Sequence, residues 1–406
     1  GVNDVLWEKK NENSVTTVEV DGDDVNDIST IRCTLVVFNN KYVNASYFLN
    51  GLKVAARKAI RLQSPFTITS ALISDTHYAT DTAARDDLTL YTRSIGHIRN
   101  VVELSNFIDI DFGVLSGDVH DGGTPNKDVA MNNFRASISA FSDLNAPYFV
   151  AWGNHDDNSW GDSRAGGILK VNNSYKNINQ NKSYHGKLQQ SLTNAEMYDI
   201  ATRPSTVFDI VENPKDKIGY YYYDVPEKNN RVIILNSQDI PKIREDGYAK
   251  YLGIVVAGYR QQQITWLYET LKNTPEGMHV SIYQHYSFGY RYSTTMSYLA
   301  YNYEFIDGLV DAFVSGGTFS RTYSENPDFK ATLNADFQGK KGIITYLAHG
   351  HHHNDRITKA ANGMVNYSIG CSVSRSKKDQ RDRPLGVLEE DLWDIVLTNT
   401  KTRTVN

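Results

Sequence analysis

Residues 67–77 read TITSALISDTH, an apolar run that ends on two residues able to bind a metal ion. The run Thr67–Ser74 predicts a buried β-strand, because it is short, apolar and rich in β-branched residues. Asp75 and His77 follow where this strand ends. In an open α/β sheet the carboxyl ends of the strands line one edge, and ligands bind there. The pair therefore predicts a ligand site at that edge.

Four more apolar runs along the chain end in the same way, on Asp, Asn or His. They are Phe112–Ser116 before GDVHD (117–121), Tyr148–Trp152 before GNHD (153–156), Met278–Tyr283 before Gln284-His285, and Ile343–Ala348 before HGHHH (349–353). Each cluster alone is a weak signal, since Asp and Asn also favour turns. Five clusters brought to one sheet edge indicate a shared metal site.

The ligand chemistry of these clusters limits the metal. Imidazole, carboxylate and amide oxygen, without a thiolate, suit Zn²⁺, Fe, Mn²⁺, Co²⁺ or Ni²⁺ rather than Ca²⁺ or an iron–sulfur cluster. About seven candidate ligands exceed the four of a tetrahedral zinc site and suit two ions that share a bridging carboxylate. The two cysteines, Cys33 and Cys371, provide neither a disulfide framework nor a cysteine-based zinc site.

Composition excludes several classes of protein. Of the 406 residues 40% are hydrophobic and 11% aromatic, which rules out wholesale disorder. No apolar run approaches the roughly 18 residues that span a bilayer. The formal net charge, 42 − 47 = −5, disfavours passive binding to nucleic acid, which needs clustered positive charge.

The segment 1–66 predicts a small β-rich N-terminal appendage. Strands are expected at Ser14–Val20 and Ile31–Phe38, where β-branched residues are dense. The chain begins with Gly1 rather than methionine, which favours a processed or excised chain and leaves the compartment open.

The segment 67–406 predicts a single catalytic domain. Short apolar runs alternate with helical periodicity there, which is typical of α/β layering. The regularity is lost at about 157–205, which we interpret as an irregular insert, and strands resume at the C-terminus from about residue 386.

The ordered set of motifs resembles the calcineurin-like metallophosphoesterase superfamily. The matching blocks are Asp75-x-His77, Gly117-Asp118-x-x-Asp121, Gly153-Asn154-His155-Asp156, His285 and Gly350-His351-x-His353. They run from Asp75 to His353 in the family's order. The resemblance implies an α/β fold, a four-layer α/β/β/α sandwich of two mixed sheets. It also leads us to expect a further strand after Val405–Asn406.

The same resemblance implies a dinuclear centre of two divalent or trivalent ions, with metal identities left open. The expected ligands are Asp75, His77 and His353 for one ion, Asn154, His285 and His351 for the other, and Asp118 as the bridge.

Three further residues are expected to take part in catalysis. The resemblance implies that His155 contacts the substrate phosphate and assists the leaving oxygen, oriented by Asp156. His120 stands in the second block where many members carry another residue, and we keep it as a third candidate.

Other histidines are expected to be structural. His349 and His352 alternate with the ligand pair on an extended segment and should point away from it. His97 lies inside a predicted helix and is expected on the surface, whereas His279, early in a strand, is expected in the core or at an edge.

These features predict a metal-dependent phosphoesterase. Phosphodiesters are the preferred substrates, attacked by hydroxide generated at the two ions. The GNHD block resembles the branch of the family that acts on cyclic nucleotides and glycerophosphodiesters. A small phosphoester or a cell-wall phosphodiester is the expected substrate.

Two alternatives stay open. One is a structural, host-binding or wall-binding component, for example of a phage tail, that keeps the metals for folding; the unmatched segment 1–66 and the insert favour it. The other is a nuclease of the same superfamily, which the charge of −5 disfavours. We expect a soluble protein, with a secreted or virion setting and the oligomeric state left open.

Overall fold

The computed structural model describes residues 4–11, 14–20, 31–33, 56–82, 88–161, 188–245, 248–287, 299–359, 364–374, 383, 385, 390–402 and 404–405. Residues 34–38 of the predicted N-terminal strand and residues 162–187 of the predicted insert lie outside this part of the chain. The predicted strand at Ser14–Val20 is confirmed with the same bounds.

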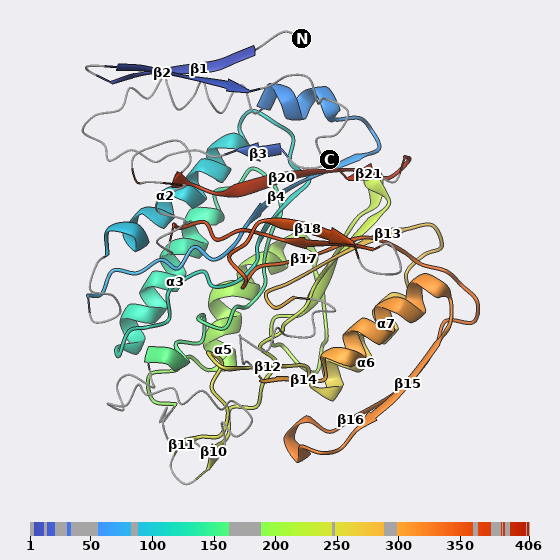
Figure 1. Ribbon diagram of the computed structural model, residues 1–406. Coiled ribbons are helices and arrows are strands. Elements are labelled where there is room, and N and C mark those ends of the chain that lie inside the picture. Colours follow the sequence, from blue (N-terminus) through green and yellow to red (C-terminus); the bar gives the residue numbers. More distant parts are fainter. Residues whose placement is uncertain are drawn as a thin grey trace.

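The α/β sandwich with two mixed sheets is confirmed (Figure 1). The first sheet has the strand order β21 (Thr404–Val405), β20 (Trp393–Asn399), β4 (Thr67–Ile73), β5 (Phe112–Leu115), β6 (Tyr148–Val150), with β3 (Ile31–Cys33) also paired to β20. Strands β4, β5 and β6 are parallel to one another, and β20 runs antiparallel to β4.

The second sheet has seven strands around a parallel centre. Its order is β18 (Arg356–Lys359), β19 (Val365–Ser368), β17 (Ile343–His349), β13 (His279–Gln284), β9 (Asn230–Ile234), β8 (Tyr221–Val225), β7 (Val211–Glu212). Strands β9, β13 and β17 are parallel. Buried apolar side chains of both sheets, among them Leu72, Val114, Val232 and Tyr283, form one cluster between them.

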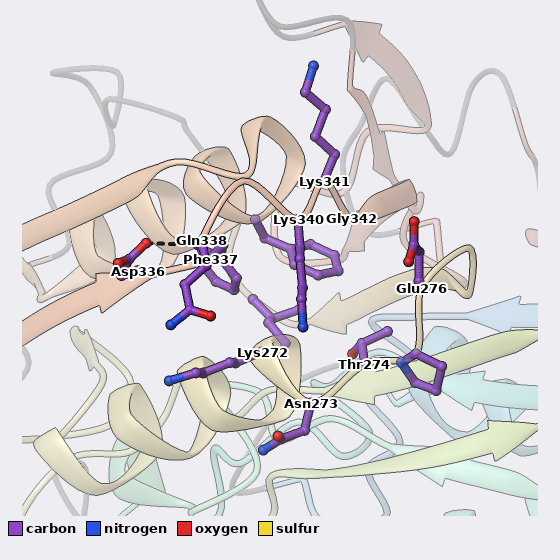
Figure 2. A pocket seen from close by; sticks show the side chains of 13 residues that line it. Lys272, Asn273, Thr274, Glu276, Asp336, Phe337, Gln338, Lys340, Lys341 and Gly342 are labelled. Carbon is purple, nitrogen blue, oxygen red and sulfur yellow. Dashed lines mark hydrogen bonds between the residues drawn. The ribbon is translucent and has the colours of Figure 1, made fainter.

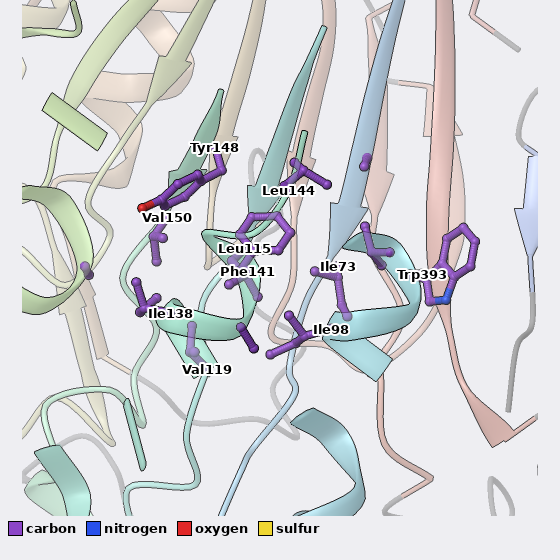
Figure 3. Close-up of a cluster of buried hydrophobic side chains, with 14 of the residues drawn as sticks. Ile73, Ile98, Leu115, Val119, Ile138, Phe141, Leu144, Tyr148, Val150 and Trp393 are labelled. Carbon is purple, nitrogen blue, oxygen red and sulfur yellow. The ribbon is translucent and has the colours of Figure 1, made fainter. Parts of the chain in front are cut away.

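Helices cover the two outer faces. Helices α2 (Thr89–Leu104) and α3 (Lys127–Phe141) bury an apolar stripe against the first sheet, as Figure 3 shows for Ile98 and Phe141. Helices α6 (Gln261–Lys272) and α7 (Tyr303–Ser315) do the same against the second sheet. The four layers follow from this arrangement of apolar faces.

The remaining elements are short. They are the strand pairs β1 (Asp4–Asn11) with β2 (Ser14–Val20), β10 (Arg244–Glu245) with β11 (Tyr248–Ala249), β12 (Val256–Gly258) with β14 (Leu299–Tyr301) and β15 (Thr318–Tyr323) with β16 (Ala331–Asp336), and the helical turns α5 (Asn194–Met197), η2 (Tyr198–Thr202), η3 (Arg203–Phe208), η4 (Pro226–Lys228) and η5 (Pro327–Phe329).

Part of the predicted irregular insert is regular. Residues 194–208 form consecutive helical turns. Thr193 and Glu196 cap their start reciprocally, and Met197 and Ile200 are buried in the core beside α3. A capping box of this kind is a sequence-level start signal that the dense Asn and Gln upstream obscured.

The parallel strands position the site. Because β4, β5 and β6 run the same way, the segments that follow them leave the first sheet at one edge, and the segments after β13 and β17 leave the second sheet in the same manner. In the described part of the chain no helix is long and apolar enough to cross a membrane.

Candidate metal centre and active site

The five predicted clusters lie together and are tied to one another by backbone hydrogen bonds. The Asp75 N–H donates to the Gly117 carbonyl at 3.0 Å, and the His77 N–H donates to the Asp118 carbonyl at 2.9 Å. The Ser116 hydroxyl donates to the Gln284 carbonyl at 2.9 Å and links the two sheets. The clusters are therefore held in place by the fold.

One group of potential ligands gathers around Asp75. The ligand atoms of Asp75, His77, Asp118 and His353 all lie within 4.8 Å of one another. His353 Nε2 is 3.0 Å from Asp75 Oδ1 and 3.4 Å from His77 Nε2. Two imidazole nitrogens that face each other beside carboxylates fit the donor set of a divalent cation.

A second group gathers on the other side of Asp118. Asp118, His285 and His351 again lie within 4.8 Å of one another. The Asn154 Oδ1 is 3.0 Å from His285 Nε2 and 2.9 Å from His351 Nδ1. His285 Nδ1 lies 2.7 Å from the Ser116 carbonyl, an acceptor only, so Nδ1–H donates and Nε2 faces the group as a potential ligand.

Asp118 belongs to both groups. Its Oδ1 is 3.2 Å from His285 Nε2, and its Oδ2 is 3.8 Å from His77 Nε2. Burial raises the pKa of Asp118, but the nearby His285 and His155 outweigh it and hold the pKa below its usual value. An ionised carboxylate shared by two groups is the arrangement expected of a bridging ligand.

The backbone at this site is strained. Of the eleven non-glycine residues with positive φ in the described part of the chain, five are predicted ligands: Asp75 (54°), His77 (46°), Asp118 (50°), His351 (68°) and His353 (56°). Such conformations are uncommon outside glycine and persist where the surroundings impose them. Their concentration here indicates a functional site.

Two glycines permit the close approach of the loops. Gly117 has φ +89°, and a Cβ there would lie 2.6 Å from His285 Nδ1. A Cβ on Gly350 would lie 2.6 Å from Asp75 Oδ2. Any side chain at either position would displace a predicted ligand.

His155 lies beside the two groups and is 8% exposed. Its backbone N–H donates to Asp118 Oδ1 at 2.9 Å, and its ring Nε2 is 3.8 Å from Asp118 Oδ2. Its Nδ1 contacts the Asp121 carbonyl, which can only accept, so Nδ1 carries the proton. Asp121 also places Oδ1 3.5 Å from His77 Nδ1. Asp121 is a site residue that sequence reasoning missed, and its position three residues after Asp118 is the signal that could identify it.

Asp156 does not orient His155 as expected. Its carboxylate accepts from the backbone N–H groups of Val119 at 2.8 Å and Gly153 at 2.7 Å. It thereby joins the loop after β5 to the loop after β6. Contact with His155 Nδ1 comes instead from the Asp121 carbonyl.

His120 is engaged by the backbone. Its Nε2 lies 2.9 Å from the Asp156 carbonyl, and the Gly122 N–H donates to its Nδ1 at 3.2 Å. The side chain is buried and its ring packs on Phe134. Both ring nitrogens of His120 contact backbone groups of the loop. The position of His120 therefore does not support a catalytic role.

The other histidines agree with expectation except one. His349 Nδ1 contacts the Gly350 carbonyl, and His352 Nε2 lies 3.2 Å from the Ser287 hydroxyl. His279 is buried, as expected. The surface position expected for His97 is wrong: it is 1% exposed and lies 3.3 Å from Asp391. Helical periodicity identified the helix but not which polar residues face inward.

A hollow of about 360 Å³ lies elsewhere (Figure 2). It is lined by the end of α6, by Phe313 of α7 and by the turn that precedes β17, including Lys340. The predicted ligands follow the far end of β17. The hollow is therefore separate from the candidate metal centre.

A comparison with models of protein families identifies the family of the chain. The model of calcineurin-like phosphoesterases matches residues 68–355, which is more than half of the chain. The chain belongs to the calcineurin-like phosphoesterase family. All of the predicted ligands fall inside the matched region.

The solved structures that match the chain include phosphatases. A dimetal phosphatase from Danio rerio is 16% identical (TM-score 0.47; 82% of this chain and 92% of that chain), and a 5'-nucleotidase from Candida albicans is 15% identical (TM-score 0.36; 83% and 52%). A purple acid phosphatase from yellow lupin is 12% identical (TM-score 0.36; 82% and 49%). No curated protein matched the chain.

Proposed function

We propose that this calcineurin-like phosphoesterase hydrolyses phosphodiesters at a dinuclear metal centre. The observation that carries the proposal is the position of Asp118, whose two carboxylate oxygens face two separate groups of ligand atoms. Family membership supports hydrolysis of a phosphoester. The division of the candidate ligands into two groups that share Asp118 supports the presence of two ions.

The donor set fits two divalent cations. One would be held by Asp75, His77 and His353, the other by Asn154, His285 and His351, with Asp118 shared. Bound cations would neutralise the phosphate charge and lower the pKa of an attacking water. The buried carboxylates of Asp75 and Asp118 supply negative charge that cations would balance.

His155 is the proposed general acid. The Asp121 carbonyl accepts a hydrogen bond from Nδ1–H of His155. The other ring nitrogen, Nε2, therefore faces Asp118, beside which the substrate would bind. Nε2 in its protonated form would donate to the departing alkoxide oxygen, work that contributes about 10²- to 10⁴-fold in rate. Asp121, Asp156 and His120 are positioning residues that fix the loops around it.

A diester preference is supported by the sequence of the loop after β6. The GNHD block (153–156) resembles that of the branch of the family that acts on cyclic nucleotides and glycerophosphodiesters, and both of these substrates are diesters.

The test is turnover of the Mn²⁺-loaded protein on bis(p-nitrophenyl) phosphate compared with p-nitrophenyl phosphate. We expect the diester to be the better substrate, and Asp118→Ala and His155→Ala each to lose at least about 100-fold in rate. His279→Gln is the matched control, because His279 lies at the opposite end of β13 from His285. Equal rates in all four proteins would overturn the proposal.

A further inference from the structure

A thiol lies beside the first group of ligands, where the sequence led us to expect none. Cys371 is buried, and its Sγ donates to the Asp75 carbonyl at 3.2 Å. The Sγ lies within 4.8 Å of a ring nitrogen of His77 and of a ring nitrogen of His353, which lie within the same distance of each other. One thiol and two imidazoles, which are soft or borderline metal ligands, therefore meet at one side of the first group of potential ligands.

The fold holds Cys371 in this place. The segment after β19 is bound to both sheets, since the Ile369 N–H donates to the His349 carbonyl at 2.7 Å and the Ser372 N–H donates to the Ser74 carbonyl at 3.0 Å. Ser74 directly precedes the ligand Asp75. The sulfur is positioned by the same strand ends as the ligands and cannot move away independently.

Asp75 points to a cation at this face. Its carboxylate is fully buried, and Oδ1 meets no hydrogen-bond donor with suitable geometry in the described part of the chain. That oxygen lies 3.0 Å from His353 Nε2 and 3.7 Å from His77 Nε2. A buried carboxylate oxygen aimed at two imidazole nitrogens is satisfied by an ion among them.

We propose that Cys371 is a sulfur ligand of the ion held by His77 and His353. The inference rests on the proposed function, because it concerns one ion of that centre. On coordination a sulfur–metal bond forms, the thiol proton passes to solvent, and the hydrogen bond to the Asp75 carbonyl is given up. A thiolate favours Fe²⁺, Co²⁺ or Zn²⁺ over Mn²⁺ at this position.

The test is the near-ultraviolet spectrum of the full chain loaded with Co²⁺ after chelation, with cobalt content measured on the same sample. We expect a sulfur-to-cobalt charge-transfer band in the wild type that is absent from Cys371→Ser. Cys33→Ser is the matched control, since Cys33 is the other cysteine of the chain, and it should retain the band. Circular dichroism verifies that each variant is folded.

The outcomes separate this inference from the proposed function. A cobalt protein that hydrolyses the diester without the band overturns the ligand role of Cys371 and leaves the hydrolase standing. A band without turnover supports the ligand role and overturns the hydrolase. A folded wild type that binds no Co²⁺ overturns both.

Metal affinity provides a second measurement. We expect Cys371→Ser to lose at least about 10-fold in Zn²⁺ affinity, while its Mn²⁺ affinity stays within a few-fold of the wild type. Equal Zn²⁺ affinities in the two proteins would contradict a sulfur ligand.

Discussion

Asp118 Oδ1 lies 3.2 Å from His285 Nε2, while its second oxygen faces His77 across the loop. One side chain is thus common to both groups of potential ligands. The two sheets meet at this carboxylate, because Asp118 follows β5 of the first sheet and His285 follows β13 of the second.

The shared carboxylate predicts that one substitution affects both ions. We expect Asp118→Ala to lower Mn²⁺ content at both positions, whereas His353→Ala should mainly remove one. Elemental analysis after gel filtration measures the difference. Asp336→Asn, an exposed residue at the end of β16, is the control and should keep the wild-type content. Retention of two ions by Asp118→Ala would contradict a bridging role.

His155 should matter most when the leaving group is poor. An acid assists an alkoxide far more than a nitrophenolate, because the alkoxide is the stronger base. We expect His155→Ala to lose about 10²-fold on an aryl diester and closer to 10⁴-fold on an alkyl diester. Steady-state rates on both substrates check this. The same loss on both would show that His155 acts in binding rather than in proton transfer.

Gly117 and Gly277 provide a matched pair. Both have positive φ, +89° and +79°, so alanine adds backbone strain of about 1–2 kcal/mol at either position. A Cβ on Gly277 would meet nothing within 4 Å, whereas one on Gly117 would lie 2.6 Å from His285 Nδ1. We expect both variants to lose stability but only Gly117→Ala to lose metal and turnover. Equal turnover in the two variants would argue against a role of His285 at the site.

Removal of the metal should lower thermal stability. The ligands bring buried carboxylates together on strained backbone, which bound cations would stabilise. At a free metal concentration of 100 times Kd we expect about 2.7 kcal/mol of added stability. Calorimetry with chelator and with Mn²⁺ measures it. Asp118→Ala should show a much smaller shift, and an equal shift in that variant would mean that the metal binds elsewhere.

The raised pKa of Asp391, a residue outside the metal centre, predicts that the stability of the fold depends on pH. Burial raises the pKa of Asp391, His97 opposes this, and the pKa is about 6. Because the unfolded pKa is near 3.9, the native state binds more protons between about pH 4 and 6, so stability falls as pH rises through that window. The loss contributed is at most about 3 kcal/mol.

The variant Asp391→Asn should lack this contribution and be more stable than the wild type above pH 6. Unfolding in urea from pH 4 to 8 measures the two slopes. Asp209→Asn changes an exposed carboxyl and should keep the wild-type slope. Parallel curves for Asp391→Asn and wild type would contradict the raised pKa.

The sheet strands and the predicted ligands could be read from the sequence because each depends on local pattern. An apolar run followed by Asp or His sets both the strand and the residue at its carboxyl end, as with Thr67–Ile73 and Asp75. The order of such runs then identified the family. Nothing in this reasoning required knowledge of contacts across the two sheets.

Contacts between residues that are far apart in the sequence could not be predicted from local pattern. Cys371 meets Asp75 across 296 positions, through the pairing of segments in different sheets, and no motif marks it. His97 is buried against Asp391 for the same reason. The hairpin of β15 and β16 was not predicted, although β16 alternates buried and exposed residues and β15 alternates half-buried and exposed ones.

Strand β4 pairs with β5 on one side and with β20 on the other. Strand β4 ends at Ile73, whereas its second partner begins only at Trp393. During synthesis on the ribosome, the loop that carries Asp75 and His77 must therefore wait for the segment that ends at Asn399 to emerge before both neighbours of β4 are present. We therefore expect cations to bind after this late segment has joined the sheet, and not while the chain is still shorter than the two strands require.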